Sequence, residues 1–245
     1  MKKVVTVLLS LLLLFYFSCK KQRSSKKIYI GTSATYPPFE YKVGHELRGF
    51  DIELASLIGK ELDKDIEIQD MQFGALLLAL QNQKIDAVLA SVTITPERTK
   101  SFDFSIPYFM DELTVVYKEG NPILSAEALQ WKKVGCQLGT TMEIWLKNRL
   151  PTSQIHAMDD NSPLIEALKA HQIDAVLLGK SQAQEFCQRN SGLSSRVIAS
   201  APDGYGIVLR KGSPLLSEFN RAVNNLEAKG ELKRLAQKWV ATSSL

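Results

Sequence analysis

The sequence has few cysteines, and their spacing fits neither a disulfide framework nor a zinc site. The 245 residues include three cysteines, Cys19, Cys136 and Cys187. None of them forms the C-x-x-C pair that is typical of a structural zinc site. Three cysteines are also too few for a set of stapling disulfides, although pairing between Cys136 and Cys187 stays open. The core must therefore be stable without cross-links.

The sequence has only a small excess of positive charge, and it has few of the loop-forming residues Gly and Pro. The chain has 30 Lys and Arg against 26 Asp and Glu, a net charge of +4. Removing a segment that holds Lys2 and Lys3 leaves 28 minus 26, or +2. Nucleic-acid-binding proteins are normally more basic, so no nucleic-acid partner is expected. With 14 Gly, 9 Pro and 45% hydrophobic residues, the composition excludes disordered and collagen-like chains and indicates an ordinary globular protein.

Signatures of catalysis and of cofactor binding are missing. The three histidines, His45, His156 and His171, lack the H-E-x-x-H spacing, and there is no G-x-S-x-G motif and no glycine-rich phosphate loop. Each histidine is predicted to lie on the surface. Cys136 lies in an apolar strand pattern, which favours an inert buried thiol over a nucleophile. No metal or cofactor is predicted.

One long hydrophobic run is present, at the start of the chain. Residues 4–17 contain only two polar side chains and follow Lys2 and Lys3. Fourteen residues are fewer than the roughly 20 that a membrane-spanning helix needs. The order of basic, apolar and small residues is typical of a secretory signal, which we place at residues 1–18. We expect the mature protein to be periplasmic.

Cys19 directly follows the apolar run, as in the bacterial lipoprotein signal, and Ser18 fits the small residue required before it. Tyr16 and Phe17 depart from the usual pattern. The prediction is a lipid anchor at Cys19, and the alternative is plain cleavage near Ser18. Residues 19–27 are rich in Lys and Arg and are predicted to form a solvated basic tether along an anionic membrane surface.

The chain contains an internal repeat. Residues 76–89 and 164–177 share eight of fourteen residues at an offset of 88, including the whole motif Ile-Asp-Ala-Val-Leu. In each copy an apolar helical stretch leads through a polar turn into an apolar strand. Because the offset is too long for a solenoid, the repeat predicts two similar α/β lobes.

The remaining pattern alternates strands and helices, which indicates an α/β fold with mostly parallel sheets and ligands at the carboxyl ends of the strands. We place lobe 1 at residues 28–109 and 205–245, lobe 2 at 110–204, and two hinge strands near 108–112 and 201–205. The amphipathic tail from Phe219 to Trp239 has no counterpart in lobe 2 and is expected to return to lobe 1. The predicted strands are 28–31, 66–69, 113–117, 134–137 and 154–157, and two further helices are predicted at 52–62 and 142–150.

One segment of the sequence is suited to an anion. Thr95 and Pro96 are a natural N-cap and first residue of a helix, which places Arg98 in its first turn. The helix dipole opposes an arginine there unless an anion is bound, and a guanidinium holds a carboxylate with two hydrogen bonds. The alternative is a structural ion pair with Asp103 or a neighbouring acid.

Two further segments are candidates for the same site. Thr140 and Glu143 have capping-box spacing, which directs the backbone amides of Thr140 and Thr141 outward, although most capping boxes bind only their own helix. Tyr36 and Phe73 each follow a strand, where an aromatic ring either packs in the core or contacts an apolar ligand stem.

Four segments of the chain are Gly31-Thr-Ser-Ala-Thr-Tyr-Pro-Pro-Phe-Glu-Tyr41, Gly49-Phe-Asp-Ile-Glu53, Ile85-Asp-Ala-Val-Leu-Ala-Ser-Val-Thr-Ile-Thr-Pro-Glu-Arg98 and Phe102-Asp-Phe-Ser-Ile-Pro-Tyr108. Together they resemble the polar amino-acid family of bacterial extracellular solute-binding proteins, the receptors of ABC importers. The resemblance extends over nearly all of residues 28–240. It implies a periplasmic-binding-protein fold of two lobes that close on one free amino acid and dock on a permease in the inner membrane.

The resemblance also implies residue roles. Arg98 is expected to bind the ligand α-carboxylate, helped by Thr93 and by the amide of Thr141. Tyr36 and Phe73 are expected to flank the ligand side chain, and the hydroxyl and carbonyl of Ser91 to meet the α-amino group. The positions at which the family adjusts selectivity are Ser33, Asp51, Gln137 and Met142.

Two positions depart from the family pattern. Many members carry an acid where this chain has Ser33, so a preference for a cationic side chain does not follow from that position. The family also places an aspartate for the ligand ammonium at the position of Gly179. The candidates for a replacement acid are Asp159, Asp160 and Glu185, and a ligand without a free α-amino group stays open.

The sequence therefore predicts a monomeric receptor for a polar or basic amino acid, without catalytic activity. The alternative is a cyclohexadienyl or arogenate dehydratase, because these enzymes resemble the receptors and bind a carboxylate with a similar arginine.

Overall fold

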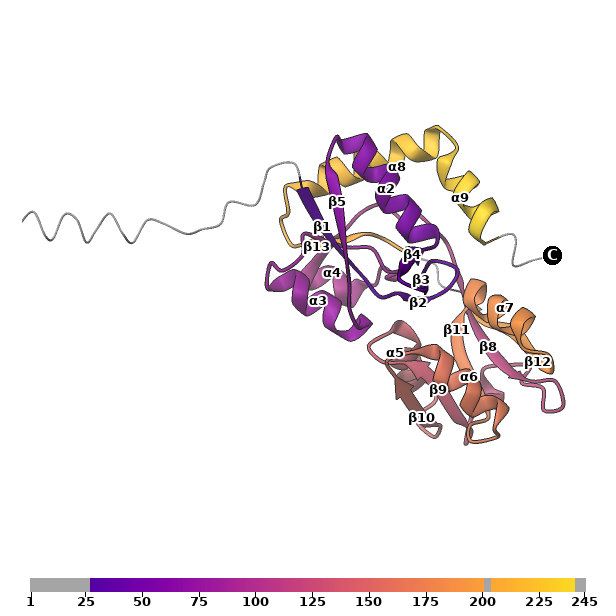
Figure 1. The fold of residues 1–245 in the computed structure, drawn as a ribbon. Coiled ribbons are helices and arrows are strands. Elements are labelled where there is room, and N and C mark those ends of the chain that lie inside the picture. The colour runs from indigo at the N-terminus through magenta and orange to yellow at the C-terminus, as the bar shows by residue number, and fades with distance from the viewer. Residues whose placement is uncertain (1–26, 201–203, 241–245) are drawn as a thin grey trace, which may run out of the picture.

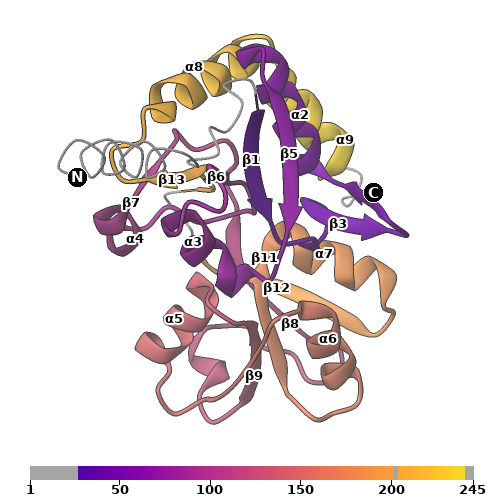
Figure 2. The same ribbon diagram turned by 60° about the vertical axis from the view of Figure 1, so that its left-hand side comes forward.

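The computed structural model describes residues 27–200 and 204–240, so the predicted signal segment and Cys19 lie outside it. Two five-stranded sheets, each covered by helices, form two lobes one above the other (Figure 1). A view turned by 60° shows the same separation, with α3 of one lobe facing α5 of the other (Figure 2). The predicted two-lobed α/β fold is confirmed.

The first lobe is built on the sheet with strand order β5-β1-β6-β13-β7, in which β5, β1 and β6 are parallel and β13 is antiparallel to both its neighbours. A small sheet of β2, β3 and β4 lies beside it. The strands are β1 (Lys27–Thr32), β2 (Thr35–Tyr36), β3 (Glu40–Val43), β4 (Glu46–Arg48), β5 (Asp65–Asp70), β6 (Ala87–Val88), β7 (Phe102–Phe104) and β13 (Val208–Arg210). The helices are α2 (Phe50–Leu62), α3 (Phe73–Gln81), α4 (Pro96–Ser101), α8 (Leu215–Ala228) and α9 (Glu231–Trp239).

The second lobe is built on the sheet with strand order β10-β9-β11-β8-β12, in which β10, β9 and β11 are parallel and β8 and β12 are antiparallel. The strands are β8 (Glu112–Lys118), β9 (Lys133–Gln137), β10 (Gln154–Met158), β11 (Ala175–Gly179) and β12 (Leu193–Ser200). The helices are α5 (Thr141–Arg149), α6 (Asn161–Lys169) and α7 (Lys180–Arg189), with a short 3₁₀ helix at Glu127–Leu129.

The internal repeat corresponds to one structural unit in each lobe. In lobe 1 the side chains of Ile85 and Leu76 pack so tightly on β1 that a Cβ on Gly31 would lie 2.4 Å from Ile85 Cδ1. In lobe 2 Leu164 and Ile173 pack on Gly135 of β9 in the same way, at 2.8 and 2.9 Å. A side chain at either position would have to displace these methyl groups, so glycine permits the close packing on the strand.

The aspartate of the repeated motif has the same role in both copies. Asp86 accepts a hydrogen bond from the backbone amide of Tyr29 at 2.9 Å, and Asp174 accepts one from that of Lys133 at 2.8 Å. Each aspartate thereby fixes its strand beside the neighbouring parallel strand, β6 beside β1 and β11 beside β9. The residues that follow β6 and β11 consequently lie where the two lobes meet.

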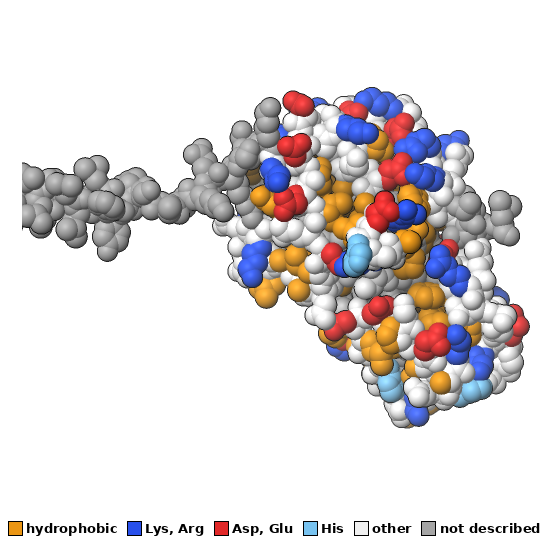
Figure 3. Space-filling view, in the orientation of Figure 1, with side chains coloured by type: hydrophobic (Ala, Val, Ile, Leu, Met, Phe, Trp, Pro, Cys, Tyr) orange, Lys and Arg blue, Asp and Glu red, His pale blue; other side chains and the backbone are white. Residues whose placement is uncertain are grey.

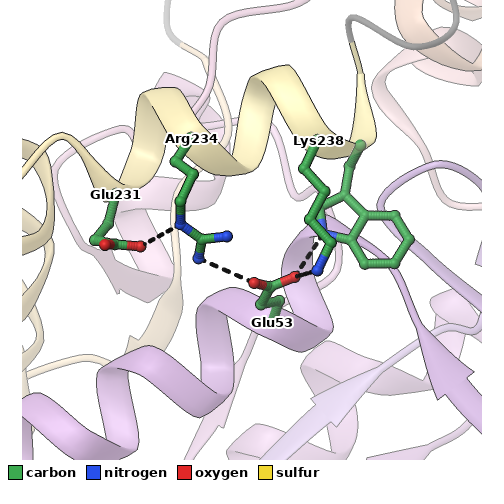
Figure 4. Close-up of polar contacts among 5 residues, drawn as sticks. Glu53, Glu231, Arg234 and Lys238 are labelled. Atoms are coloured by element: carbon green, nitrogen blue, oxygen red, sulfur yellow. Dashed lines mark hydrogen bonds and ion pairs between the residues drawn. The ribbon is translucent and has the colours of Figure 1, made fainter.

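The C-terminal tail returns to lobe 1 as predicted, but as two helices. Helix α8 ends at Ala228 and α9 begins at Glu231, because Gly230 adopts a left-handed conformation with φ 75°. Both helices pack on α2 through buried apolar residues. At the surface Glu53 of α2 binds Arg234, Lys238 and the indole of Trp239 (Figure 4). Such exposed pairs contribute about 1 kcal/mol or less each, so apolar burial carries most of the attachment.

Charged side chains of both signs are interspersed over α2, α8 and α9 on the face shown in Figure 3. This face of lobe 1 therefore presents no extended area of one charge.

Two segments connect the lobes and lie side by side. Tyr108 donates its amide to the carbonyl of Tyr205 at 2.9 Å, and Tyr205 donates its amide to that of Phe109 at 2.8 Å. The rings of Phe109 and Tyr205 pack against Phe39, with centroids 5.0 and 5.5 Å away. Residues 201–203 of the second predicted hinge strand lie outside the described residues.

The start of α2 is docked directly on the aromatic loop that follows β1. The amides of Phe50 and Asp51 donate to the carbonyls of Pro38 and Phe39 at 3.1 and 2.9 Å. Gly49 makes this contact possible, because it has φ 125° and a Cβ there would lie 2.1 Å from the oxygen of Phe39.

We predict that Gly49→Ala lowers the free energy of unfolding by about 3 kcal/mol or more, because it combines a disfavoured φ with a backbone collision. Urea denaturation measures this loss. The matched control is Gly44→Ala, where φ is 62° and no atom lies within 4 Å of the new Cβ. There the expected loss is only about 1 kcal/mol. Equal losses at the two positions would show that the docking of α2 on the aromatic loop contributes little.

Candidate ligand-binding site

A cavity between the lobes gathers ten of the eleven predicted ligand-binding residues. The space between the atoms that line it, including space open to solvent, is about 340 Å³. The predicted residues that line it are Ser33, Tyr36, Phe73, Ser91, Thr93, Arg98, Gln137, Thr140, Thr141 and Met142. Ala90 and Glu40 also line it and were not predicted. Asp51 does not line the cavity and lies buried behind it.

Arg98 lies at one end of the cavity, held by the start of α4. Thr95 is the N-cap and accepts a hydrogen bond from the Arg98 amide at 3.2 Å, with Pro96 in the first turn, as predicted. The guanidinium donates to the carbonyl of Thr93 at 2.9 Å and to that of Gly139 at 3.1 Å. Arg98 therefore bridges the two lobes. Asp103 pairs with Lys211 instead, so the alternative of an Arg98–Asp103 ion pair is wrong.

The Arg98 guanidinium has no carboxylate partner among the residues that the structure describes. Burial lowers the pKa of Arg98 to about 10, so the group stays charged at neutral pH. The ring of Phe73 lies 6.0 Å from its central carbon. A charged, partly desolvated guanidinium with only neutral acceptors is suited to bind an anion.

The lobes are in contact around the cavity. The hydroxyls of Thr93 and Thr141 lie 3.4 Å apart. The side-chain amide nitrogen of Gln137 lies 3.5 Å from the hydroxyl of Thr35. Outside the cavity Gln72 donates to Asp159 at 3.1 Å. Each of these contacts joins lobe 1 to lobe 2, so the structure represents a closed conformation.

The start of α5 differs from the predicted capping box. The Thr140 hydroxyl donates to the carbonyl of Gln137 at 2.6 Å and does not cap α5. Glu143 accepts from the amide of Gly139 at 2.8 Å. The capping-box prediction is therefore wrong, because Thr140 bonds to the preceding strand end. As a result, no side chain caps the amides at this helix start, which faces the cavity beside Arg98.

Glu40 lies behind Ser91 and forms a buried acidic pair with Asp51. Both residues are 1% exposed. Glu40 accepts from the Ser91 hydroxyl at 3.2 Å. Asp51 accepts from the Ser91 amide at 2.8 Å and from the Tyr108 hydroxyl at 2.9 Å, which holds Ser91 at a φ of 50°. The docking of α2 permitted by Gly49 places the two acids together.

Burial and the proximity of the two carboxyl groups favour a single proton held between Glu40 and Asp51. Burial, and then the charge of Asp51, raise the pKa of Glu40 well above its ordinary value. Burial also raises the pKa of Asp51 to about 6, against the effect of its hydrogen bonds from Ser91 and Tyr108. One oxygen of Asp51 has no other hydrogen-bond partner among the described residues. A proton between the carboxyl groups satisfies that oxygen and leaves a single negative charge.

The three acids considered as replacements at Gly179 do not line the cavity. Asp159 bonds to Gln72, Asp160 caps α6 by accepting from the Ser162 amide, and Glu185 pairs with Arg189. Glu40 is the one acid that lines it within the described residues. Sequence reasoning missed Glu40 although it lies in the quoted aromatic motif, because its burial depends on residues 51 and 91.

The expectations about histidine and cysteine agree with the structure. The three histidines are exposed. Cys136 is fully buried, and burial raises its thiol pKa to about 12, which makes it inert at neutral pH. Cys136 and Cys187 are both free thiols. Within residues 27–200 and 204–240 no group of His, Cys, Asp and Glu has the arrangement of a metal site. No helix in those ranges is both long and apolar enough to cross a membrane.

Two curated proteins with a similar sequence are transport receptors. The arginine-binding extracellular protein ArtP of Bacillus subtilis is 38% identical over 223 residues, which cover 89% of this chain and 88% of that protein. The L-cystine-binding protein TcyJ of Escherichia coli K12 is 32% identical over 224 residues, which cover 89% of this chain and 84% of that protein.

Solved structures with the same fold contain bound amino acids. An ancestral arginine-binding protein bound to arginine superposes with a TM-score of 0.84 at 37% identity, covering 87% of this chain and 98% of that one. The substrate-binding protein AbpA of Streptococcus pneumoniae bound to L-arginine gives 0.84 at 31% identity, covering 92% and 99%.

The family assignment rests on most of the chain. Residues 28–242 match the model of the bacterial extracellular solute-binding proteins, family 3. This range includes both lobes and every residue that lines the cavity. The resemblance found in the sequence is thus confirmed, and the chain belongs to family 3 of the bacterial extracellular solute-binding proteins.

Proposed function

We propose that this protein is the receptor of an amino-acid ABC importer and that its ligand is a cationic L-amino acid, with arginine as the first candidate. The observation that carries the proposal is the pairing of charges in one closed cavity, where Arg98 and Glu40 both line the walls. A zwitterion with a cationic side chain is matched by an arginine that binds its carboxylate and an acid that binds its side chain.

Arg98 is assigned to the α-carboxylate, with the Thr93 hydroxyl and the amide of Thr141 as further donors. The bidentate geometry of a guanidinium fits a carboxylate, and the start of α5 adds the positive end of a helix dipole. Tyr36 and Phe73 are assigned to the two sides of the ligand stem. Ser91 is assigned to the α-amino group.

Glu40 is assigned to the cationic side chain. A buried carboxylate is costly unless a cation or proton compensates it, so it favours a charged guest over a neutral one. The relatives fit this assignment, since ArtP is named as arginine-binding and AbpA was solved with L-arginine. The L-cystine-binding relative shows that the family is not restricted to arginine.

The cellular setting is part of the proposal. The family is extracellular, and we propose that Cys19 carries a lipid that tethers a monomeric receptor near its permease through the basic residues 19–27.

A ligand screen tests the function. The protein is purified from residue 20 onward, unfolded and refolded to remove carried ligand, and heated with each of the twenty amino acids, prephenate and arogenate. Arginine is expected to raise the melting temperature most, since a ligand stabilises by RT ln(1 + [L]/Kd). Stabilisation by prephenate alone, with loss of prephenate absorbance, would favour the dehydratase instead.

We predict that arginine binds more weakly in acid. A proton on Glu40 removes the charge that the cationic side chain needs, so the affinity rises as the pH rises through the raised pKa of Glu40. Calorimetric titrations from about pH 5 to about pH 8 measure this, with a slope of up to about one decade per pH unit. Citrulline, whose side chain is neutral, is the control and is expected to bind with a shallower pH dependence. If the affinities for arginine and citrulline changed equally with pH, the assignment of Glu40 to the cationic side chain would be contradicted.

A further inference from the structure

Another buried acid, apart from Glu40 and Asp51, lies close to the cavity, at the junction of both lobes and both connecting segments. Asp111 is 6% exposed and belongs to the first connecting segment, just before β8. One of its oxygens accepts from the hydroxyl of Tyr205 at 2.9 Å. The other accepts from the amide of Ser181, in the first turn of α7, at 3.3 Å. Asp111 therefore connects the second connecting segment to lobe 2.

The chain of hydrogen bonds continues to the ligand cavity. Tyr205 is hydrogen-bonded to Tyr36, which lines the cavity from lobe 1. The Tyr36 oxygen in turn accepts from the amide of Gly179 in lobe 2 at 3.1 Å. Since Tyr205 donates its proton to Asp111, the Tyr36 hydroxyl donates to Tyr205. The hydroxyl groups of Tyr36 and Tyr205 thus each donate a hydrogen bond.

Gly179 leaves room for this arrangement. A Cβ at residue 179 would lie 2.4 Å from a carboxylate oxygen of Asp111, 2.6 Å from the Tyr36 hydroxyl and 2.8 Å from the Tyr205 hydroxyl. The three polar atoms fill the space that any side chain would need. Gly179 has an ordinary extended backbone, with φ −70°. Glycine therefore matters here because it has no side chain, and not because of its backbone conformation.

The bond between Tyr36 and Gly179 depends on lobe closure. Tyr36 packs in the core of lobe 1, whereas Gly179 ends the central strand β11 of lobe 2. Separation of the lobes would break this bond, whereas Tyr205 and Asp111 lie on the two segments that connect the lobes. A charged acceptor strengthens and orients a hydrogen-bonded chain. Burial and the charge of Asp111 raise the pKa of Tyr36, which keeps its hydroxyl a donor.

We propose that Asp111 is a positioning residue for ligand binding, which acts through Tyr205 to hold the Tyr36 hydroxyl against the Gly179 amide and so stabilises the closed conformation. The effect acts on closure and not on the choice of ligand. It therefore goes beyond the proposed function and does not depend on arginine being the ligand.

Two variants disrupt the hydrogen-bonded chain at different points. Tyr205→Phe deletes the hydroxyl that links Tyr36 to Asp111 and keeps the ring packed against Phe39 and Phe109. Gly179→Ala inserts a methyl group among the three polar atoms. The matched control is Tyr117→Phe, which deletes another buried tyrosine hydroxyl, on β8 within lobe 2.

The first readout needs no ligand. Hydrogen exchange of the Gly179 amide in the full chain is expected to be about tenfold faster in Tyr205→Phe than in the unchanged protein, because the acceptor Tyr36 is held less firmly. Tyr117→Phe is expected to leave this rate unchanged. An unchanged rate in Tyr205→Phe would overturn the proposal, even if Gly179→Ala failed to fold.

The second readout is binding. Calorimetry with L-arginine and with L-citrulline is expected to give affinities about tenfold or more lower for both probes in Tyr205→Phe and in Gly179→Ala, with the ratio between the probes unchanged. A change in that ratio would mean that the hydrogen bonds among Asp111, Tyr205 and Tyr36 select the ligand. It would overturn the proposal that they stabilise the closed conformation. If neither probe bound the unchanged protein, the proposed function would fail while the exchange experiment would still decide the role of Asp111.

Discussion

Replacement of Arg98 by alanine is expected to weaken the binding of any amino acid by about 2 to 5 kcal/mol, the range measured when one partner of a buried charge pair is removed. The ligand carboxylate would enter the cavity without its bidentate donor. The loss is expected for arginine and citrulline alike, because both carry the same α-carboxylate. Isothermal titration calorimetry measures it.

The structure supplies the controls for this substitution. Arg98→Lys keeps the charge but loses the two parallel hydrogen bonds, so an intermediate loss is expected. Arg48→Ala removes an exposed arginine that pairs with Glu46 on β4 and is expected to leave the affinity unchanged. If Arg98→Ala bound with unchanged affinity, the assignment of the carboxylate to this end of the cavity would be wrong.

Replacement of Glu40 by glutamine is expected to lower the affinity for arginine by about 2 to 3 kcal/mol, because a charge-assisted hydrogen bond in a buried site is lost. The affinity for citrulline is expected to stay nearly the same. Glutamine has the shape of the protonated acid, and its amide group can donate to the Asp51 oxygen that otherwise has no hydrogen-bond partner among the described residues. The fold is therefore expected to survive.

Calorimetry with both ligands distinguishes two roles for Glu40. If Glu40 bound the α-ammonium group instead of the side chain, Glu40→Gln would weaken arginine and citrulline by the same amount. The matched control is Glu46→Gln, an exposed glutamate in the adjoining strand that pairs with Arg48. It is expected to change neither affinity.

Local patterns in the sequence predicted the parts of the fold that depend on local forces. The repeated Ile-Asp-Ala-Val-Leu motif indicated two related lobes, because each copy carries its own packing contact on a glycine and its own aspartate bond to a neighbouring strand. The cap of α4 by Thr95 also followed from residue types alone. Such features need only neighbouring residues or one repeated unit.

The predictions that failed depend on contacts between distant segments or on competing bonds. Glu40 is a charged residue in a short strand, and only its contacts with Ser91 and Asp51 show that it is buried. Thr140 has the right spacing for a capping box, yet the carbonyl of Gln137 takes its hydroxyl. The space beside Gly179 is filled by Asp111, a residue 68 positions earlier in the chain.

The measurement that tests the central claim most directly is the calorimetric comparison of L-arginine with L-citrulline on the unchanged, ligand-free protein at neutral pH. The two ligands have nearly the same shape and the same α-amino and α-carboxyl groups, and they differ in the charge that Glu40 is assigned to recognise. We expect arginine to bind about thirtyfold more tightly or better, equivalent to about 2 kcal/mol. Equal affinities, or binding of citrulline alone, would contradict a receptor for cationic amino acids.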